Sequence, residues 1–452
     1  MQIFVVKNNQ YLGLLRQETQ SITFTYSENI PITEYIQGLN NPTNEATQLF
    51  PVFENMLPEH SQLELIKQKH NISTQIEALC FLDNIHGSYE FYNELDFAKR
   101  TQITPRQTIV YEKVKQEILD NQYTFPNILN GYDLQIDDSI LHPTQLTNNN
   151  AMGLSGFQYK FGVSKDDTTK IITRHEGEAS DYFIKPYNWA HTQFVAHDKN
   201  RSYIPYLLIN EHIFMTLARD LGFDVPYNAI VRGKSDYHYI IKRFDRYKNT
   251  KIDHYEMLTL MNKNSEQKYL VSMNELLQTV REHINAKELL ELYQFVVFSI
   301  IIGHGDLHAK NLSLIHASNK PNERQLTISP YYDISTTKIY QETKQNDIGL
   351  MVGNKQRRIN KKDLLALAYS LGMKESDASE AMARLGREFI TNFMHYIMAL
   401  PHDIKALPYH INKYKQIPLE AKFKKYYEER KKYINEYLLN TPTQEMSENI
   451  WE

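Results

Sequence analysis

The chain has 452 residues, with 50 Lys and Arg against 54 Asp and Glu and 41% hydrophobic residues, which describes an ordinary globular protein with room for two or three domains. Its net charge of −4 provides no overall basic field, so nucleic acid would be met through a local patch or a partner protein. Its single cysteine, Cys80, cannot form an internal disulfide and favours a reducing compartment, and no apolar run reaches the roughly 18 to 20 residues that span a bilayer. We therefore predict a cytoplasmic protein without a membrane segment.

The first part of the chain predicts a small α+β subdomain over residues 1–125. Three short apolar or β-branched runs, 3–6, 11–15 and 21–26, are separated by polar turns and predict an antiparallel meander. Helices broken at Pro58 follow the meander.

A change of composition follows this subdomain. Residues 126–150 are rich in Asp, Asn, Thr and Pro and show no periodicity, so we interpret them as a linker or surface insertion. Residues 151–246 are rich in predicted strands, residues 247–440 are mainly helical, and 441–452 form a tail. The order predicts an α+β fold with a strand-rich lobe followed by a helical lobe.

The sharpest local signal is the segment IIGHGDLHAKNLSLI, in which Asp306 and Asn311 lie five residues apart in a polar loop between a buried helix and an apolar strand. In protein-kinase-like sites, an Asp at this position accepts the proton of the substrate hydroxyl and the Asn holds magnesium. Taken alone, the motif has a simpler interpretation as a turn between a helix and a strand, with Asp306 as a capping residue. About twenty residues later, however, Asp333 follows Tyr331 and Tyr332, where such enzymes place a second magnesium carboxylate.

Features upstream fit a nucleotide site. Lys185 lies near the end of the predicted strand DYFIKPY, from which its ammonium could reach ATP phosphates, and Glu211 on the helix predicted over 208–221 is its candidate partner. The turn GLSGFQYK, from Gly153 to Lys160, could cradle phosphates, although a Gly-X-X-Gly turn is more often a plain hairpin. The Lys and Glu likewise have a simpler interpretation as solvated surface charges.

Two other candidates carry less weight. His304 and His308 have metal-like spacing, but no Cys or third His accompanies them in the sequence, so zinc is not predicted. Cys80 lies in an apolar stretch and is predicted to be an inert thiol rather than a nucleophile.

Taken together, the motifs resemble those of HipA-family serine/threonine kinases, the toxins of bacterial HipBA-type modules. The similarity runs along most of the chain: YLGLLRQETQSITFTYSENI and FENMLPEH in the N-terminal part, GLSGFQYK and YFIKPY in the strand-rich lobe, IIKRFDR at the hinge, and GDLHAKN and SPYYDIS in the helical lobe. The resemblance implies a bilobal protein-kinase-like fold with an additional N-terminal α+β subdomain. It also implies an ATP- and Mg²⁺-dependent kinase.

The resemblance implies roles for individual residues. Asp306 would be the catalytic Asp, Asn311 and Asp333 would bind magnesium, and Glu211 would support the ATP lysine. ATP would be bound by residues of the glycine loop, the lysine strand, the hinge and the catalytic loop: Gly153, Ser155, Gly156, Phe157, Gln158, Tyr159, Lys160, Lys185, Lys242, Arg243, Phe244, His308 and Lys310.

Family members can phosphorylate a serine in the glycine loop and so switch themselves off, and here the matching position falls near Gly153. Ser155 is the nearest hydroxyl and becomes the candidate autophosphorylation site. The resemblance further implies a HipB-like helix-turn-helix antitoxin, contact with DNA only through that antitoxin, and a protein substrate in translation, such as an aminoacyl-tRNA synthetase.

Two alternatives stay open at this point. HGDLHAKN is also the catalytic-loop pattern of aminoglycoside and choline kinases, so the chain could be a small-molecule phosphotransferase. A degenerate kinase that acts only by binding a partner is the second alternative, although Asp306, Asn311, Asp333 and Lys185 are all present.

Overall fold

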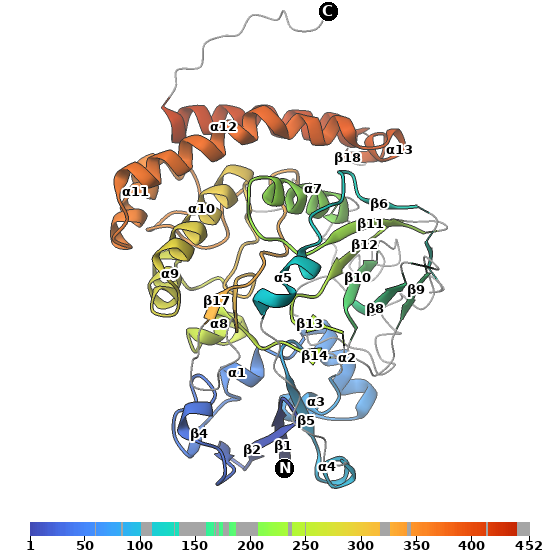
Figure 1. Cartoon of the computed structure of the whole chain (residues 1–452), viewed down its shortest axis with the longest axis vertical. Helices are drawn as coiled ribbons and strands as arrows, with labels where there is room; N and C mark the ends of the chain where they lie inside the picture. Colours follow the sequence, from blue (N-terminus) through green and yellow to red (C-terminus); the bar gives the residue numbers. More distant parts are fainter. Residues whose placement is uncertain are drawn as a thin grey trace, which may run out of the picture.

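The structure is a computed structural model. It describes residues 1–58, 60–82, 85–100, 111–130, 132–134, 160–166, 168, 171–174, 180–186, 207–233, 237–248, 250–316, 326–340, 345–412 and 415–440. Figure 1 shows an N-terminal unit at the bottom, a strand-rich region beside the centre, and helices that build the opposite side and the top. Among the described residues, no helix is long and apolar enough to cross a membrane.

The N-terminal unit is built on a five-stranded sheet with the order β4-β3-β2-β1-β5. The meander predicted at the start of the chain is confirmed, because β1, β2 and β3 pair antiparallel in sequence order. Along these strands buried and more exposed side chains alternate, as the two faces of a sheet require. The strands are β1 (Gln2–Lys7), β2 (Gln10–Gln17), β3 (Ile22–Tyr26), β4 (Thr43–Ala46) and β5 (Tyr89–Tyr92).

Short helices complete a separate hydrophobic core on one face of this sheet, and Phe97 of the last helix stacks on Phe4 on the other face. Phe53, which is fully buried, meets Phe24 and Phe91 edge to face in that core. Pro58 lies between the helices that end at Glu54 and begin at His60, as predicted from the sequence. The helices of this unit are η1 (Ile32–Glu34), α1 (Pro51–Glu54), α2 (His60–His70), α3 (Gln75–Leu79) and α4 (Glu94–Lys99).

Residues 111–134 join the rest of the protein rather than the N-terminal core. Helix α5 (Tyr111–Leu119) packs on Ile252 and Ile315. Strands β6 (Ile128–Leu129) and β7 (Asp133–Leu134) lie on the two edges of the next sheet. The sequence reading of 126–150 as a linker did not anticipate these strands, because two-residue strands held by parallel pairing to distant partners carry no periodicity of their own.

The strand-rich lobe is a seven-stranded sheet with the order β6-β11-β12-β10-β8-β9-β7. Helix α7 (Leu207–Asp220) packs on β11 and β12, and Gly222 follows it with φ +96, a left-handed conformation that glycine adopts without strain. The remaining strands are β8 (Phe161–Asp166), β9 (Ile171–Arg174), β10 (Tyr182–Pro186), β11 (Asn228–Arg232) and β12 (Tyr237–Lys242).

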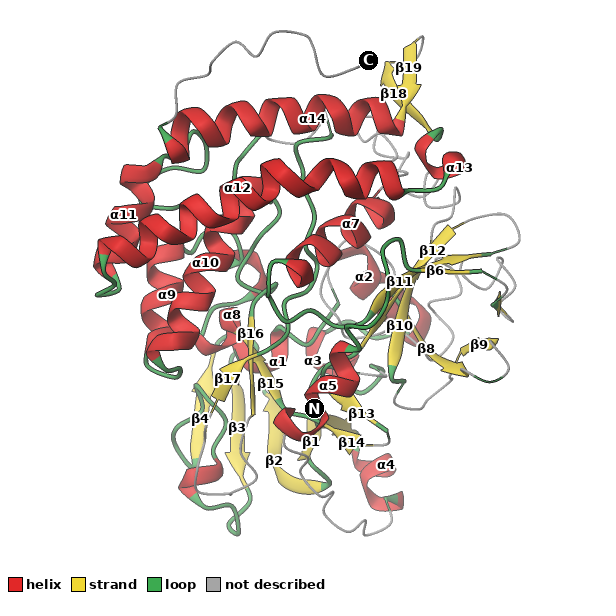
Figure 2. Ribbon diagram, turned by 45° about the horizontal axis from the view of Figure 1, so that its top comes forward, coloured by secondary structure: helices red, strands yellow, loops and turns green. Residues whose placement is uncertain are grey.

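The helical lobe surrounds α10 (Ala286–Ile302), whose last eight residues are all buried. Figure 2 shows α12 and α14 lying side by side across the top of the molecule, and α10 packs on α12 below them. The other elements, in chain order, are β13 (Arg246–Tyr247), β14 (Thr250–Lys251), β15 (His254–Glu256), α8 (Met257–Leu260), η4 (Ser265–Gln267), α9 (Met273–Arg281), β16 (Ser313–His316), β17 (Leu326–Ile328), α11 (Lys361–Ser370), α12 (Glu375–Ala399), α13 (His402–Lys405), β18 (Pro408–Asn412), β19 (Lys415–Pro418), α14 (Leu419–Tyr433) and the π-helix η5 (Ile434–Leu439).

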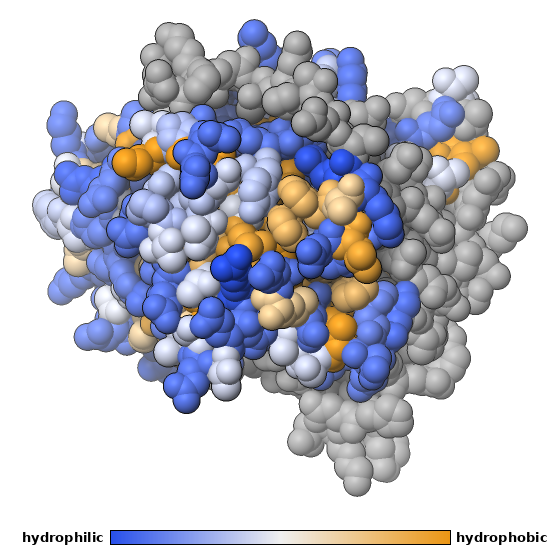
Figure 3. All heavy atoms as spheres, turned by 90° about the horizontal axis from the view of Figure 1, so that it is seen from below, coloured by the Kyte–Doolittle hydropathy of each residue, from blue (hydrophilic) through white to orange (hydrophobic). Residues whose placement is uncertain are grey.

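The lower end of the molecule has a mostly hydrophilic surface with patches of apolar side chains (Figure 3). Ile32 and Leu95 of the N-terminal unit are each 73% exposed. Single exposed apolar residues of this kind are normal on protein surfaces.

Candidate active site

The loop between α10 and β16 carries the predicted catalytic residues. Helix α10 ends at Gly303, whose φ of +71 turns the chain out of the helix, and an added Cβ there would lie 2.4 Å from the Lys338 side chain. Asp306 is exposed and accepts a hydrogen bond from the Tyr269 hydroxyl. The side chain of Asn311 is turned back into the loop, where its Oδ1 accepts the His308 N–H at 3.1 Å.

The segment TISPYYDIS places three neighbouring side chains in three environments. Tyr331 stacks on Phe295 of α10, with 3.9 Å between ring centroids, and so fixes the segment to the core. Tyr332 donates its hydroxyl to the carbonyl of Lys310 at 2.8 Å, which ties the segment to the catalytic loop. Asp333 follows with φ +54, a left-handed conformation that is costly for a non-glycine residue and is often found at functional sites.

Asp333 and Glu211 together hold the ammonium of Lys185. Lys185 Nζ lies 2.7 Å and 2.8 Å from the two carboxylate oxygens of Glu211 and 2.5 Å from Asp333 Oδ1. Lys160 Nζ lies 3.5 Å from Asp333 Oδ2, so two ammonium groups meet two carboxylates. Four residues singled out from the sequence thus lie in one cluster. Lys185 comes from β10, Glu211 from α7, Lys160 from the position before β8 and Asp333 from the segment after β17.

Burial and charge act against each other in this cluster. Burial disfavours the charge of Lys185, but the carboxylates of Asp333 and Glu211 outweigh that effect and raise its pKa. The pKa of Asp333 is lowered because, although burial opposes its charge, Lys160 and Lys185 stabilise the carboxylate. Burial lowers the pKa of Lys160 and raises that of Glu211. Side chains that are 8% and 2% exposed, such as Lys160 and Lys185, rarely remain charged without a partner of this kind.

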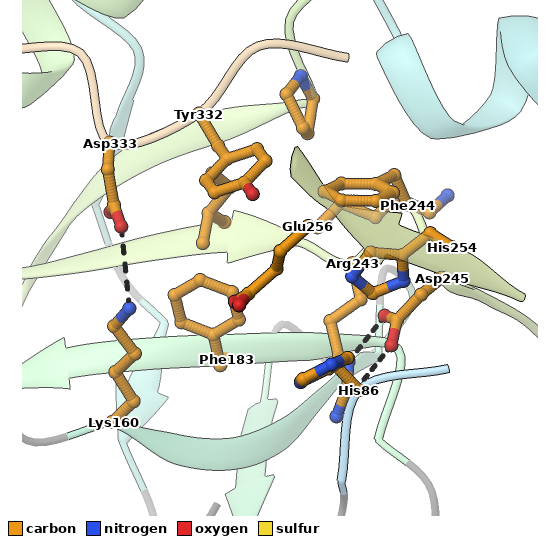
Figure 4. Close-up of a pocket in the computed structure, with 13 residues that line it drawn as sticks. His86, Lys160, Phe183, Arg243, Phe244, Asp245, His254, Glu256, Tyr332 and Asp333 are labelled. Atoms are coloured by element: carbon orange, nitrogen blue, oxygen red, sulfur yellow. Dashed lines mark hydrogen bonds and ion pairs between the residues drawn. The ribbon is translucent and has the colours of Figure 1, made fainter. Parts of the chain in front are cut away.

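A partly open pocket adjoins the cluster. Figure 4 shows Asp333 and Lys160 together on one side of it, and His86, Arg243 and Asp245 on the other. Most of the other residues that line the cavity are apolar or aromatic: Phe183, Pro226, Ile241, Phe244 and Tyr332. The rest are Lys242, His254 and Glu256.

The hinge after β12 lines this cavity, but its side chains bind elsewhere. Lys242 Nζ donates to the Glu117 carbonyl at 2.7 Å, and the Arg243 guanidinium pairs with Asp245 at 2.7 Å. The backbone N–H groups of Lys242 and Arg243 already donate to the carbonyls of Tyr227 and Asp181.

Lys310, which the resemblance implies as an ATP-binding residue, is bonded to the N-terminal unit in the structure. Its ammonium is fully buried and donates to the Asn55 carbonyl at 3.0 Å and to Ser265 Oγ at 3.1 Å, with Glu256 Oε2 at 3.8 Å. Lys310 therefore joins the catalytic loop to the N-terminal unit and does not line the cavity. Its position in the motif suggested the ATP-binding role, and the contact with Asn55 has no signal in the sequence.

The predicted glycine-loop residues, 153–159, lie outside the described residues.

His308 is buried within the catalytic loop. Its burial and the nearby charges of Lys268 and Lys310 lower its pKa. Sequence reasoning missed Tyr269 at Asp306 and His86 at the cavity. Neither lies in a recognisable motif, and each reaches the site only through tertiary packing.

Comparisons with known proteins identify the family of the chain. The family model described as HipA-like C-terminal domain matches residues 152–393, more than half of the chain, and the chain belongs to this family. A Haemophilus influenzae protein named "Putative kinase" is 26% identical over 206 residues, which cover 42% of this chain and 54% of that protein. "Putative kinase Y4mE" of Sinorhizobium fredii is 23% identical over 340 residues, 71% of this chain and 73% of that protein.

The fold is also that of a solved HipA. The structure from Shewanella oneidensis, described as a complex of the toxin–antitoxin proteins HipA and HipB with operator DNA, matches with a TM-score of 0.65 at 17% identity. The match covers 97% of this chain and 98% of that one. The α+β, kinase-like fold expected from the sequence is therefore confirmed. The chain spans about half the length of the first two curated relatives it matches, 54% and 46%.

Proposed function

We propose that the chain is an ATP-dependent serine/threonine protein kinase. The observation that carries the proposal is the buried Lys185, which is held by Glu211 and Asp333. Asp333 lines one side of a cavity whose wall includes the Lys242–Phe244 hinge. Paired ammonium groups beside an apolar cavity suit a ligand with a flat base and a negatively charged phosphate chain.

The residues present fit ATP with magnesium. Asn311 and Asp333 would hold Mg²⁺, which neutralises charge on the phosphates when bound. Lys160 and Lys185 would bind phosphate oxygens, in line with the burial of both ammonium groups. Asp306 is exposed, so a hydroxyl group of a protein can reach it, and its carboxylate would orient that hydroxyl and accept its proton.

Labelled ATP tests the transfer reaction directly. The wild type should label protein bands in a cell lysate, and Asp306→Asn should lower labelling by orders of magnitude because the proton acceptor is lost. Asp377→Asn, an exposed Asp in the first turn of α12, is the matched control and should label as the wild type does. Label on added aminoglycosides or choline instead of protein would favour a small-molecule phosphotransferase.

We further propose that the kinase inhibits growth as a toxin, pairs with a HipB-like helix-turn-helix antitoxin and meets DNA only through it. The net charge of −4 and the fold shared with the solved HipA support this proposal. Its substrate would be a translation component, such as an aminoacyl-tRNA synthetase. Co-purification of the protein with the product of a neighbouring gene, and operator binding only by the pair, would test the partner.

Autophosphorylation at Ser155 is part of the same proposal. In the glycine turn predicted from the sequence, a doubly charged phosphate on Ser155 would be repelled by the ATP phosphates and would displace the segment. Mass spectrometry after incubation with ATP should find phosphate within residues 150–165; its absence there would exclude Ser155 as the switch.

A further inference from the structure

The hydroxyl of Tyr269 is hydrogen-bonded to Asp306, the residue that an acceptor hydroxyl must reach. Tyr269 follows η4 in the chain, 37 positions before Asp306, and its O–H donates to Asp306 Oδ1. A general base must be within hydrogen-bond reach of the hydroxyl whose proton it accepts. In this structure the Tyr269 hydroxyl already makes that hydrogen bond.

Further contacts hold Tyr269 at the catalytic loop. Its ring meets the His308 ring edge to face, with 5.1 Å between centroids. The neighbouring Lys268 carbonyl accepts the N–H of Ala309 at 3.2 Å, and the Lys268 ammonium lies 5.3 Å from the centre of the Tyr269 ring. The hydrogen bond to Asp306 is therefore part of a packed arrangement, not an isolated surface contact.

Tyr269 is nonetheless 38% exposed, and Asp306 is exposed as well. Tyr269 does not line the nucleotide cavity. The Tyr269 hydroxyl thus occupies a hydrogen-bonding position on an exposed Asp306 that an acceptor hydroxyl could otherwise use.

We propose that Tyr269 is a specificity-determining residue that competes with the acceptor hydroxyl for Asp306. The inference rests on the proposed kinase function. A protein acceptor can displace the Tyr269 hydroxyl because its other contacts with the enzyme compensate for the lost hydrogen bond. Water and small alcohols make no such contacts and are excluded.

Hydrolysis of ATP without a protein acceptor reports on this competition. In that reaction a water oxygen bonds to the γ-phosphorus, the bond to the ADP oxygen breaks, and Asp306 accepts a proton from water. Tyr269→Phe keeps the ring against His308 and removes only the hydroxyl. It should raise kcat for hydrolysis about 3- to 10-fold, the effect of one net hydrogen bond, with KM for ATP unchanged.

The matched control is Tyr369→Phe. Tyr369 is 59% exposed on α11, and its hydroxyl donates to the Glu375 carboxylate at 2.6 Å, so the same type of hydrogen bond is removed away from the site. This variant should hydrolyse ATP as the wild type does. Tyr269→Ala, which also removes the contact with His308, should lower labelling of lysate proteins.

The outcomes separate this inference from the proposed function. Faster hydrolysis by Tyr269→Phe, with Tyr369→Phe at the wild-type rate, supports the competition. If the wild type labels lysate proteins while Tyr269→Phe hydrolyses ATP at the wild-type rate or more slowly, the competition is refuted and the kinase function stands. Phosphate found on Tyr269 by mass spectrometry would make it an acceptor and refute the inference, and absence of any transfer or hydrolysis by the wild type would refute both.

Discussion

The ammonium of Lys310 in the catalytic loop donates to the carbonyl of Asn55, 255 positions earlier in the chain, at 3.0 Å. Asn55 is itself fully buried, and its side-chain amide donates to Thr259 Oγ1 at 3.0 Å and to the Lys263 carbonyl at 2.9 Å. The end of α1 is therefore built into the helical lobe directly beside the catalytic loop. We infer that the N-terminal unit stabilises this loop as well as forming its own core.

Replacing Lys310 should destabilise the protein without weakening nucleotide binding. Lys310→Met keeps the length of the side chain but leaves the Glu256 carboxylate and the Asn55 carbonyl without their cation. Removing one partner of a buried pair typically lowers the free energy of unfolding by about 3–5 kcal/mol. Chemical unfolding and titration with a nucleotide measure the two effects separately.

Lys263→Met is the control for this variant. Lys263 pairs with Glu275 at 3.8 Å on the surface, so its loss should cost under about 1 kcal/mol. Weaker nucleotide binding by Lys310→Met at unchanged stability would restore the ATP-binding role that the sequence motif suggested.

Glu211→Gln should impair catalysis more than folding. The neutral amide keeps the shape of the side chain but no longer neutralises Lys185, which then has only Asp333 as a carboxylate partner at 2.5 Å. We expect phosphotransfer to fall on the order of tenfold or more, since the charges that stabilise the transition state are no longer held in place. Kinetic assays beside Glu380→Gln, an exposed Glu on α12, measure this effect; equal rates for the two variants would count against the Lys185–Glu211 pair.

His212 should make stability depend on pH. Its Nε2 accepts the Asn127 N–H at 3.1 Å, and its Nδ1 lies 2.6 Å from Asn228 Oδ1, so the neutral ring with hydrogen on Nδ1 satisfies both partners. Burial lowers the pKa of His212 to about 4 from its ordinary value of 6.5. Because the unfolded chain binds this proton more readily, the stabilisation is complete above pH 6.5 and is lost as the pH falls toward 4.

Urea unfolding between pH 4.5 and 7.5 measures that dependence. One pKa unit corresponds to about 1.4 kcal/mol, so His212 alone accounts for a loss of a few kcal/mol across the range. His212→Gln should be less stable at neutral pH and should show a shallower pH dependence. Parallel curves for the variant and the wild type would show that His212 does not titrate as described.

Arg430 should be needed to anchor the helix that leads into the catalytic loop. Its guanidinium donates to the Ile300 and Ile301 carbonyls at 2.5 and 2.8 Å, at the C-terminus of α10, and pairs with Asp347 at 3.0 Å. Cations are favourable at this end of a helix. Arg430→Met should lower the free energy of unfolding by about 3–5 kcal/mol, because it leaves Asp347 with Lys338 as its remaining cation.

The matched control is Arg384→Met on α12, whose exposed guanidinium donates to Gln294 at 3.2 Å and should contribute under about 1 kcal/mol. Thermal unfolding of both variants gives the comparison. A similar, small loss in both would mean that Arg430 behaves as a surface charge.

The sequence predicted those parts of the site that local patterns encode. Lys185 lies on a predicted strand and Glu211 on a helix with an apolar face, and both elements are present as β10 and α7. Asp333 lies five residues beyond the end of β17 at Ile328, so its interval after the catalytic-loop motif, and not a strand, was the signal that identified it. The contacts of Lys310 with Asn55 and of Tyr269 with Asp306 join segments 255 and 37 positions apart and depend on tertiary packing. The two-residue strands β6 and β7 were missed for the same reason, because their pairing partners lie about a hundred and about forty residues away.

The most direct test of the central claim is phosphoproteomics after induced expression of the wild type and of Asp306→Asn. If the chain is a serine/threonine protein kinase, expression of the wild type should arrest growth and add phosphate to serine or threonine in a small set of proteins, including a translation component, and Asp306→Asn should do neither. Growth arrest by Asp306→Asn at the wild-type level, with no phosphosite that depends on Asp306, would contradict the claim.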